Sequence, residues 1–477
     1  MSELPKGWAK TSLGEIAVWG SGGTPSRSEP SFYGGSIPWI KSGELNARYV
    51  KSTEESITEA AVSGSSAKIF PAGSVAIAMY GATIGKTAIL GVDAATNQAC
   101  AVGIPIEGLT DTEFLYRLLQ NEKDAFIEKG KGGAQPNISQ AVIKAHEVSL
   151  PPLAEQTRIA AKLDELLAQV DTLKARIDGI PALLKRFRQS VLATAVSGRL
   201  TAEWREKNTR CLDVVVNPKA NKLSMEELAA AEEILGEPLP AFWQKYALEQ
   251  LVEPGRGIPY GIVQTGAAVE KGVPTVRCGD VKNLFIDTSN LKAVSAEVEQ
   301  EYKRTRLKGG EVLLAIRGSV GNVGVAPESL RDCNISREVA MIPTLPSVVP
   351  FYLACILQSP LGQRLLVGKV RGVAQKGINL ADVRRLTVAL PSYEEQTEIV
   401  RRVEQLFAFA DQLEAKVKDA KARIDRLTQS ILAKAFRGEL VPQDPDDEPA
   451  RELLARIQAQ RASASKAKRG RKQAENP

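Results

Sequence analysis

The sequence predicts an α+β protein: two mixed α/β domains in a pseudo-two-fold repeat, separated by two long antiparallel coiled-coil helices. The first observation is an internal duplication, because residues 150–201 recur without a gap as 390–441, with 20 identities in 52 positions. The second is that both copies carry apolar residues at alternating steps of three and four, the a and d pattern of a coiled coil. Two similar halves in one chain predict an internal two-fold axis.

The duplication extends beyond the helices and divides the chain. Residues 73–81 match 310–318, and both are short apolar runs between glycines, which predict strands joined by turns. Residues 111–120 and 350–358 predict short helices. We therefore expect globular domains at 1–149 and 239–389, long helices at 150–201 and 390–441, a linker at 202–238 and a C-terminal extension at 442–477.

The repeated segments predict an intramolecular helix pair, which is antiparallel because helices related by a two-fold axis across them run in opposite directions. About 45 residues at 1.5 Å each give a rod of roughly 65 Å, close to two turns of B-DNA at roughly 34–36 Å each. Pro181 removes a backbone hydrogen bond, so the first helix should kink there or restart after Gly179. The predicted seam residues are Leu163, Leu166, Val170, Leu173, Ile177, Leu184, Phe187, Val191, Val403, Leu406, Leu413, Val417, Ile424, Leu427 and Ile431.

Composition narrows the class of protein. The chain is 43% hydrophobic and 25% charged, which is ordinary for a soluble globular protein. Apolar runs are too short to predict a membrane span, and the first residues lack the apolar stretch of a signal peptide. The five cysteines are scattered without a CxxC pair, which argues against a disulfide framework or a zinc site. The expected location is the cytoplasm.

The net charge of +6 is unevenly distributed. Residues 461–477 hold six Lys/Arg and one Glu, residues 254–385 hold 18 Lys/Arg and 11 Asp/Glu, and residues 6–149 hold 13 and 14. The second domain is therefore basic, and the first is close to neutral. A basic segment suits a polyanion such as DNA, although a solvated basic face explains the same charge. The polar segment 461–477 predicts disorder.

The sequence offers no convincing catalytic apparatus. His146 is the only histidine, so a structural role is the better prediction, and a histidine-rich metal centre is excluded. The segment 81–87, GATIGKT, has three residues between its first glycine and Gly-Lys, where a phosphate-binding loop needs four. Its counterpart in the second half has no lysine. The absence of these motifs argues against catalysis by this chain.

The chain resembles the specificity subunit of Type I restriction-modification systems. The resemblance is carried by LPPLAEQTRIAAKLDELLAQVDTLKARID with LKRFRQSVLATAVSGRLT, by the second copy LPSYEEQTEIVRRVEQLFAFADQLEAK with LTQSILAKAFRGELVPQDPDDEPA, and by GSVAIAMYGATIGKTAIL and GEVLLAIRGSVGNVGVA. It implies two target recognition domains that each read half of a split, asymmetric DNA sequence, and helices that fix the gap. It also implies docking of two modification (methyltransferase) subunits and, through them, restriction subunits. S-adenosylmethionine, ATP and magnesium are then expected on those partners, with no cofactor in this chain, which by this resemblance binds DNA and catalyses no reaction itself.

Candidate DNA contacts follow from residue chemistry in loops that correspond between the halves. Arg or Lys suits guanine, Asn or Gln suits adenine, and Ser or Thr suits either, while further basic groups bind phosphate. In the first domain the candidates are Lys41, Ser42, Tyr80, Lys86, Asn97, Gln98 and Gln135. In the second they are Arg277, Arg317, Ser319, Asn322, Ser336, Arg337 and Lys376.

Two other functions remain open from the sequence. The heptads alone allow a coiled-coil interaction scaffold that does not bind specific DNA. A self-sufficient nuclease or methyltransferase is the other rival, because the carboxylate-and-lysine motif of nucleases is degenerate. The target sequence and the gap between half-sites cannot be derived, since DNA shape readout leaves no trace in the protein sequence.

Overall fold

The fold is that of a computed structural model, which describes residues 4–474 except 131–136, 209–213, 236–237, 265, 267–268, 270 and 368–376. The chain forms two compact units, one of residues 1–177 with 419–477 and the other of residues 178–418. Each unit contains one α/β domain and parts of two 44-residue helices, α6 (Leu153–Val196) and α13 (Tyr393–Phe436). These units and helices confirm the predicted fold class.

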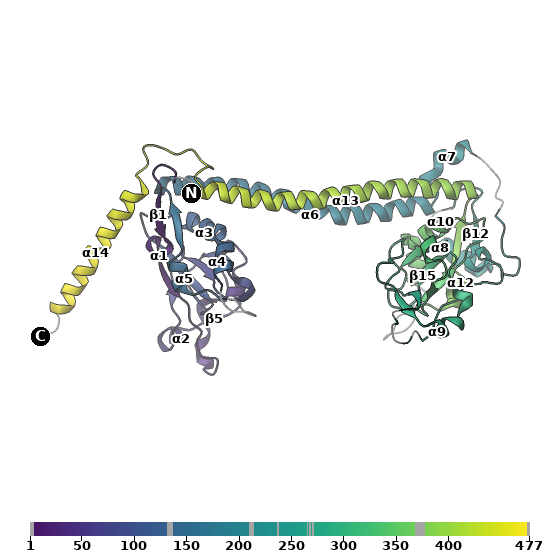
Figure 1. Cartoon of the computed structure of the whole chain (residues 1–477), viewed down its shortest axis with the longest axis horizontal. Coiled ribbons are helices and arrows are strands. Elements are labelled where there is room, and N and C mark those ends of the chain that lie inside the picture. The colour runs from purple at the N-terminus through teal and green to yellow at the C-terminus, as the bar shows by residue number, and fades with distance from the viewer. Residues whose placement is uncertain are drawn as a thin grey trace. The chain divides into compact units, whose positions relative to one another are not determined.

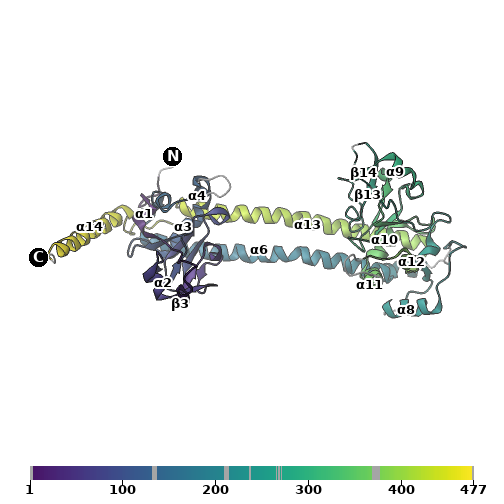
Figure 2. The same ribbon diagram turned by 90° about the horizontal axis from the view of Figure 1, so that it is seen from below.

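The first unit has a two-stranded and two larger sheets (Figures 1 and 2). The small sheet pairs β1 (Ala9–Ser12) with β11 (Glu147–Leu150), antiparallel. The central sheet has the order β2 (Ala17–Ser21), β10 (Cys100–Pro105), β7 (Val75–Ala78), β8 (Thr87–Leu90) and β4 (Tyr49–Val50). The third has the order β5 (Ser56–Ile57), β3 (Tyr33–Ile40), β9 (Ala94–Thr96) and β6 (Ile69–Phe70).

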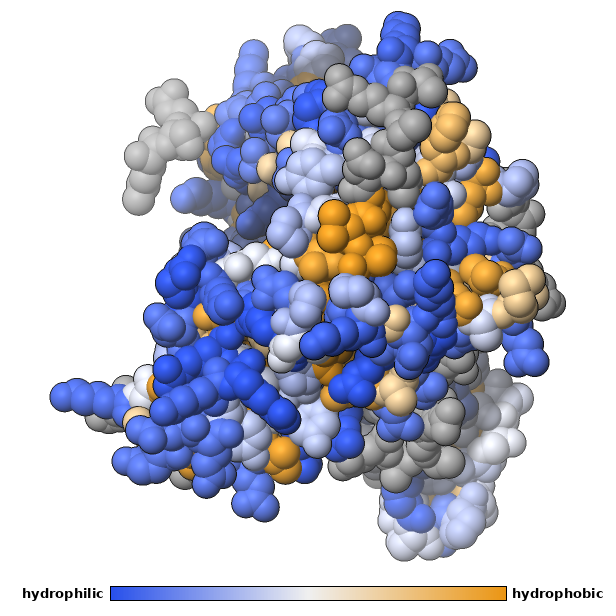
Figure 3. Space-filling view, turned by 90° about the vertical axis from the view of Figure 1, so that its right-hand side faces the viewer, coloured by the Kyte–Doolittle hydropathy of each residue, from blue (hydrophilic) through white to orange (hydrophobic). Residues whose placement is uncertain are grey.

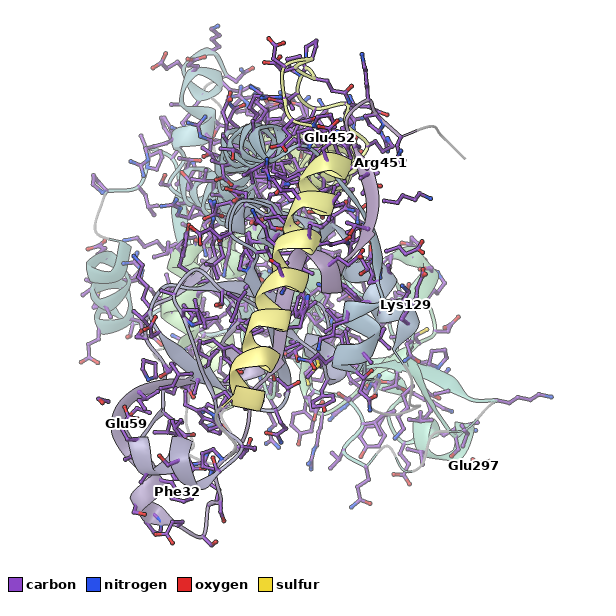
Figure 4. All side chains as sticks on the ribbon, turned by 90° about the vertical axis from the view of Figure 1, so that its left-hand side faces the viewer. Phe32, Glu59, Lys129, Glu297, Arg451 and Glu452 are labelled. Carbon is purple, nitrogen blue, oxygen red and sulfur yellow. The ribbon has the colours of Figure 1, made fainter. Side chains whose placement is uncertain are left out.

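Helices complete the first domain. They are α1 (Leu13–Ile16), α2 (Glu59–Gly64), α3 (Thr112–Asn121), α4 (Lys123–Lys129) and α5 (Gln140–Lys144). Phe32 and Glu59 lie in the lobe around α2, at the opposite end of this unit from Arg451 and Glu452 (Figure 4). The main core gathers apolar residues of α3 and the central sheet with both long helices, from Leu163 on α6 to Ala435 on α13.

The second unit repeats this plan. Strand β12 (Gln244–Ala247) pairs with β19 (Thr387–Leu390) as β1 pairs with β11. One sheet has the order β16 (Val323–Val325), β15 (Val312–Ala315) and β18 (Val339–Ile342), and another has β14 (Lys292–Val294), β13 (Val273–Val276) and β17 (Asn334–Ile335). The domain's helices are α9 (Ala296–Gln300), α10 (Pro350–Gln358), α11 (Pro360–Val367) and α12 (Leu380–Arg384).

The two long helices run antiparallel within each unit. In the first, Lys174 Nζ lies 3.3 Å from Asp425 Oδ1; in the second, Arg188 lies 3.0 Å from Glu414 Oε2. Residue numbers thus rise along one helix as they fall along the other. Helix α6 continues through Pro181, so the helix does not restart there as the sequence allowed. Each helix is followed, two residues after its last one, by a glycine with positive φ, Gly198 at 74° and Gly438 at 75°, the conformation that suits a C-terminal cap.

The predicted seam is buried to different degrees. Leu163, Val170, Leu184, Val191, Val403 and Ile424 are buried. Leu173 and Leu427, by contrast, are each 46% exposed, which differs from the expectation for a seam. Two helices without a third neighbour cover little of each other's surface, so positions beside the line of contact face solvent. The other predicted seam residues are partly buried.

Two segments expected to lie outside the domains pack onto them. Helix α8 (Met225–Leu235) belongs to the expected linker, and Arg385 of the second domain binds Glu227 on it, with 2.8 Å from Nε to Oε1. Helix α14 (Ala450–Ala474) buries Ala450 and Leu453 in the core of the first domain. The prediction of disorder at 461–477 therefore differs from the structure, in which the helix extends to Ala474. The segment is rich in Ala, Lys, Arg and Gln, which favour helix.

Candidate nucleic-acid interface

Three predicted loops converge at one end of the first domain. The Asn97 N–H donates to the Ile40 carbonyl at 2.9 Å, which brings the end of β9 to the end of β3. The Met79 N–H donates to the Ala99 carbonyl at 2.8 Å, and Tyr80 forms a β-bridge with Asn137. The folded sheet therefore brings together candidates that are far apart in sequence, namely Lys41, Ser42, Tyr80, Asn97 and Gln98.

The charge of Lys41 is balanced by carboxylates. Its Nζ lies 3.1 Å from Glu54 Oε2 and 3.0 Å from Glu55 Oε1. Arg27 pairs with Glu55 as well, at 2.6 Å, and stacks on Tyr33 with 4.4 Å to the ring centroid. Hydrogen bonds from Arg27 and then from Lys41 lower the pKa of Glu55 to about 2. This surface is thus a mixed-charge one, in agreement with the nearly neutral charge of the domain.

The other candidates of the first domain have different surroundings. Tyr80 is 43% exposed, and Gln98 accepts a hydrogen bond from Thr24. The side-chain oxygen of Asn97 is buried without a hydrogen-bond partner. Lys86 donates to Asn46 Oδ1 at 2.8 Å and lines a separate hollow between this domain and the long helices. Gln135 lies outside the described residues.

The corresponding loops converge in the second domain. The Ser336 N–H donates to the Val276 carbonyl at 2.9 Å, and Arg317 forms a β-bridge with Gly377. Arg317 and Arg337 then line one open pocket of about 220 Å³. Its other lining residues are Tyr260, Val263, Ile316, Ile378, Asn379 and Leu380. This pocket joins two exposed guanidinium groups with an aromatic ring and an aliphatic floor.

Some candidates of the second domain have structural partners. Arg277 pairs with Asp280, at 3.3 Å from Nε to Oδ2, and Asn322 donates to the Val281 carbonyl at 3.0 Å. Ser336 is buried at 4% exposure, whereas Ser319 is exposed. Lys376 lies outside the described residues.

Sequence reasoning missed Tyr260, which is 47% exposed beside Arg317 and Arg337. An aromatic residue between Pro259 and Gly261 in a basic domain was the available signal, because exposed aromatic rings mark binding surfaces.

The repeated Glu-Gln pair fastens each domain to its helix. Glu155 of α6 accepts from the Trp8 indole at 3.0 Å, and Glu395 of α13 accepts from the Trp243 indole at 3.2 Å. The neighbouring Gln156 accepts a hydrogen bond from the N–H of Asp111, the residue that directly precedes α3, at 2.9 Å. Gln396 does the same for Val349 before α10, at 2.8 Å. The residues that attach each domain to its long helix are therefore the same in both copies of the repeat.

His146 has the surroundings of a structural residue. It is 4% exposed, and its Nε2 lies 2.8 Å from Glu122 Oε2 while its Nδ1 lies 2.7 Å from Lys129 Nζ. Its ring lies 4.6 Å from that of Phe126. Burial alone would raise the pKa of Glu122, but hydrogen bonds from His146 and Asn121 lower it. Within the described part of the chain, no cluster of three His, Cys, Asp or Glu residues could hold a metal ion.

No helix of the described residues is both long and apolar enough to cross a membrane. On the face drawn in Figure 3, hydrophilic side chains predominate, and hydrophobic ones form small separate patches.

The repeat, the seated domains and the converging polar loops define a class of protein: a duplicated binding protein with two similar domains, each held on its own long helix. The family model for the Type I restriction modification DNA specificity domain matches residues 5–182 and 243–420. The chain therefore belongs to the family of Type I restriction-modification specificity subunits, with two DNA specificity domains.

Known relatives agree with this assignment. The EcoBI specificity subunit of Escherichia coli is 40% identical over 368 residues, covering 75% of this chain and 74% of that protein. The EcoKI specificity subunit of E. coli K12 is 31% identical, covering 98% and 99%. Among solved structures, the HsdS subunit of Thermoanaerobacter tengcongensis has a TM-score of 0.55 at 20% identity, covering 92% of this chain and 98% of that one. That likeness supports the fold.

Proposed function

We propose that each recognition domain reads one half of a bipartite, asymmetric DNA target. The observation that carries the proposal is that equivalent loops have different chemistry in the two domains. The positions that hold Tyr80 and Gln98 in the first domain hold Arg317 and Arg337 in the second, where they line an open pocket. Guanidinium groups suit guanine and amides suit adenine, so one scaffold with two sets of donors fits two different half-sites.

The long helices have two roles in this proposal. They set the distance between the half-sites, and they dock two modification subunits, through which restriction subunits join. The duplicated helix sequence supports this, because identical partners need similar surfaces in both halves. S-adenosylmethionine, ATP and magnesium belong to those partners. Purified chain with DNA, magnesium and S-adenosylmethionine should therefore show no turnover, and turnover would favour a self-sufficient enzyme instead.

The test uses the chain in complex with its modification subunits. Methylated adenines mapped across the host genome should reveal two different half-sites at a constant spacing. Arg317→Ala should weaken binding of that target by about 1–3 kcal/mol and relax one half-site only. Arg331→Ala is the matched control, since Arg331 is exposed and pairs with Glu328 away from the pocket. Equal binding of target and random duplex by the wild-type complex at moderate salt would support the interaction scaffold.

A further inference from the structure

Asp164 of α6 holds two arginines of the first domain at once. Its Oδ2 lies 2.6 Å from Arg48 Nη2, and its Oδ1 lies 2.7 Å from Arg117 Nη2. Arg48 also pairs with Glu113 of α3, at 2.5 Å. The two arginines come from different parts of the domain, since Arg48 precedes β4 and Arg117 lies on α3. One helix carboxylate thus ties down two separate elements of the domain.

This network is sheltered from solvent. The side chain of Arg117 is 12% exposed, and those of Arg48 and Asp164 are 31% and 33% exposed. Burial alone would raise the pKa of Asp164, but hydrogen bonds from Arg117 and Arg48 lower it below its ordinary value. Asp164 is therefore ionised at neutral pH, and charge-assisted hydrogen bonds of this kind are strong and directional.

The second half has apolar residues in the same place. The hydrogen bonds from the Asp111 and Val349 N–H groups to Gln156 and Gln396 align α3 with α10 at a distance of 238 positions, so the counterparts of Glu113 and Arg117 are Phe351 and Cys355. The counterpart of Asp164, 240 positions further on, is Glu404. Cys355 is buried in the core of the second domain, at 0% exposure, Phe351 packs against that core, and Glu404 is exposed. The register that aligns residues 37–44 with 273–280 makes Leu284 the counterpart of Arg48, and Leu284 packs against that same core. The two domains are thus attached to their helices differently.

We propose that Asp164, Arg48 and Arg117 form a positioning site that fixes the angle of the first recognition domain on α6, and so restricts the half-site spacings that the subunit accepts. The inference rests on the proposed function. Apolar packing is non-directional, whereas two hydrogen-bonded arginines on the two oxygens of one carboxylate define an orientation. A domain without this anchor should tilt over a wider range of angles and tolerate more spacings.

The experiment compares spacing selectivity in the complex with modification subunits. Duplexes carry both mapped half-sites at the native gap or at gaps one and two base pairs longer or shorter. Asp164→Asn should reduce the affinity ratio of native to altered gaps by about tenfold, while the preference for each half-site sequence stays unchanged. Glu404→Gln, the matched control in the second half, should leave the ratio as it is. Arg48→Lys, which keeps the charge but loses the planar fork, should give a smaller reduction.

Three outcomes separate the possibilities. An unchanged ratio in both Asp164→Asn and Arg48→Lys would overturn the positioning role. If Asp164→Asn loses all binding, the affinity ratio of Arg48→Lys decides the positioning role. A melting curve checks that Arg48→Lys is folded. Wild-type complex that does not distinguish target from random duplex would refute the proposed function itself, before any variant is compared.

Discussion

The two Trp–Glu contacts look equivalent in sequence, but the structure predicts that they respond differently to the same substitution. Glu395 Oε1 accepts from Thr201 at 2.7 Å and from Arg205 Nη2 at 2.7 Å, in addition to the Trp243 bond to Oε2. Glu155 accepts from Trp8, and the nearby Arg158 pairs with Asp447 instead, at 2.6 Å. Burial raises the pKa of Glu155, and the Trp8 bond offsets this only in part.

Glu395→Gln should therefore destabilise its domain by about 1.5–3 kcal/mol at pH 7, because it removes the charge that Arg205 binds. Glu155→Gln should lie within about 0.5 kcal/mol of wild type or be stabilising. The sign of this change in stability follows from the raised pKa of Glu155, because the folded state binds the Glu155 proton more tightly than the unfolded state. Ionised Glu155 therefore lowers the stability once the pH rises above the ordinary pKa of a glutamate. Glutamine abolishes that effect.

Native-state hydrogen exchange measures the two effects separately, from the opening free energies of amides in β1 and in β12. Glu394→Gln is the control, because Glu394 is exposed next to Glu395. Equal losses in both domains, or a larger loss for Glu155→Gln, would refute the account of the Arg205 contact.

Three further predictions concern packing, the linker and the C-terminal segment. Phe114→Ala should destabilise the first unit by about 3–5 kcal/mol, since Phe114 is fully buried and packs against Phe436 at 5.6 Å; a thermal melt that moves by less than a degree would contradict this. Arg385→Ala should release α8 and expose the linker to limited proteolysis. The Arg385 hydrogen bond lowers the pKa of Glu227 to about 2 from 4.5, so in wild type the same release should occur as the pH falls through that window, and equal protection of α8 amides at pH 5 and pH 2 would argue against it. Deletion of 461–477, which carries six Lys/Arg and one Glu, should flatten the salt dependence of binding to random duplex, and an identical slope would show that the segment makes no phosphate contact.

The fold was predictable because its determinants are periodic and repeated. Apolar steps of three and four fixed the helices, and the duplication predicted that they form a pair with an internal two-fold axis. Pro181 was ambiguous because a proline kinks or ends a helix according to what packs around it. The repeated Glu-Gln pair marked the residues that attach each domain to its long helix. The indole partner of each glutamate could not be predicted, because it lies about 150 residues earlier in the chain and no local pattern reveals it.

The candidate interface was predictable only as a set of loops. Residue chemistry selected Lys41 and Arg317 on equal grounds, yet the first is neutralised by Glu54 and Glu55 while the second lines an open pocket. Such pairings depend on which side chains the folded sheets bring together. For the same reason, the packing of the expected linker and of the C-terminal extension on the domains could not be predicted. Arg385 is enough to bind α8, and a few apolar residues are enough to bind α14. The contacts to DNA themselves stay predictions.

The duplication also explains why the halves are not interchangeable. Glu155 and Glu395 are the same residue in both copies, and each accepts the indole hydrogen bond of a tryptophan from its own domain. The two arginines that bind Asp164 have no basic counterparts, because Leu284 and Cys355 take the places of Arg48 and Arg117. A second domain grafted onto α6 would place Leu284 and Cys355 beside Asp164 and leave a partly buried carboxylate unpaired, which is destabilising. Exchange of recognition domains between the two helices should therefore also require a change of the helix residue that faces them.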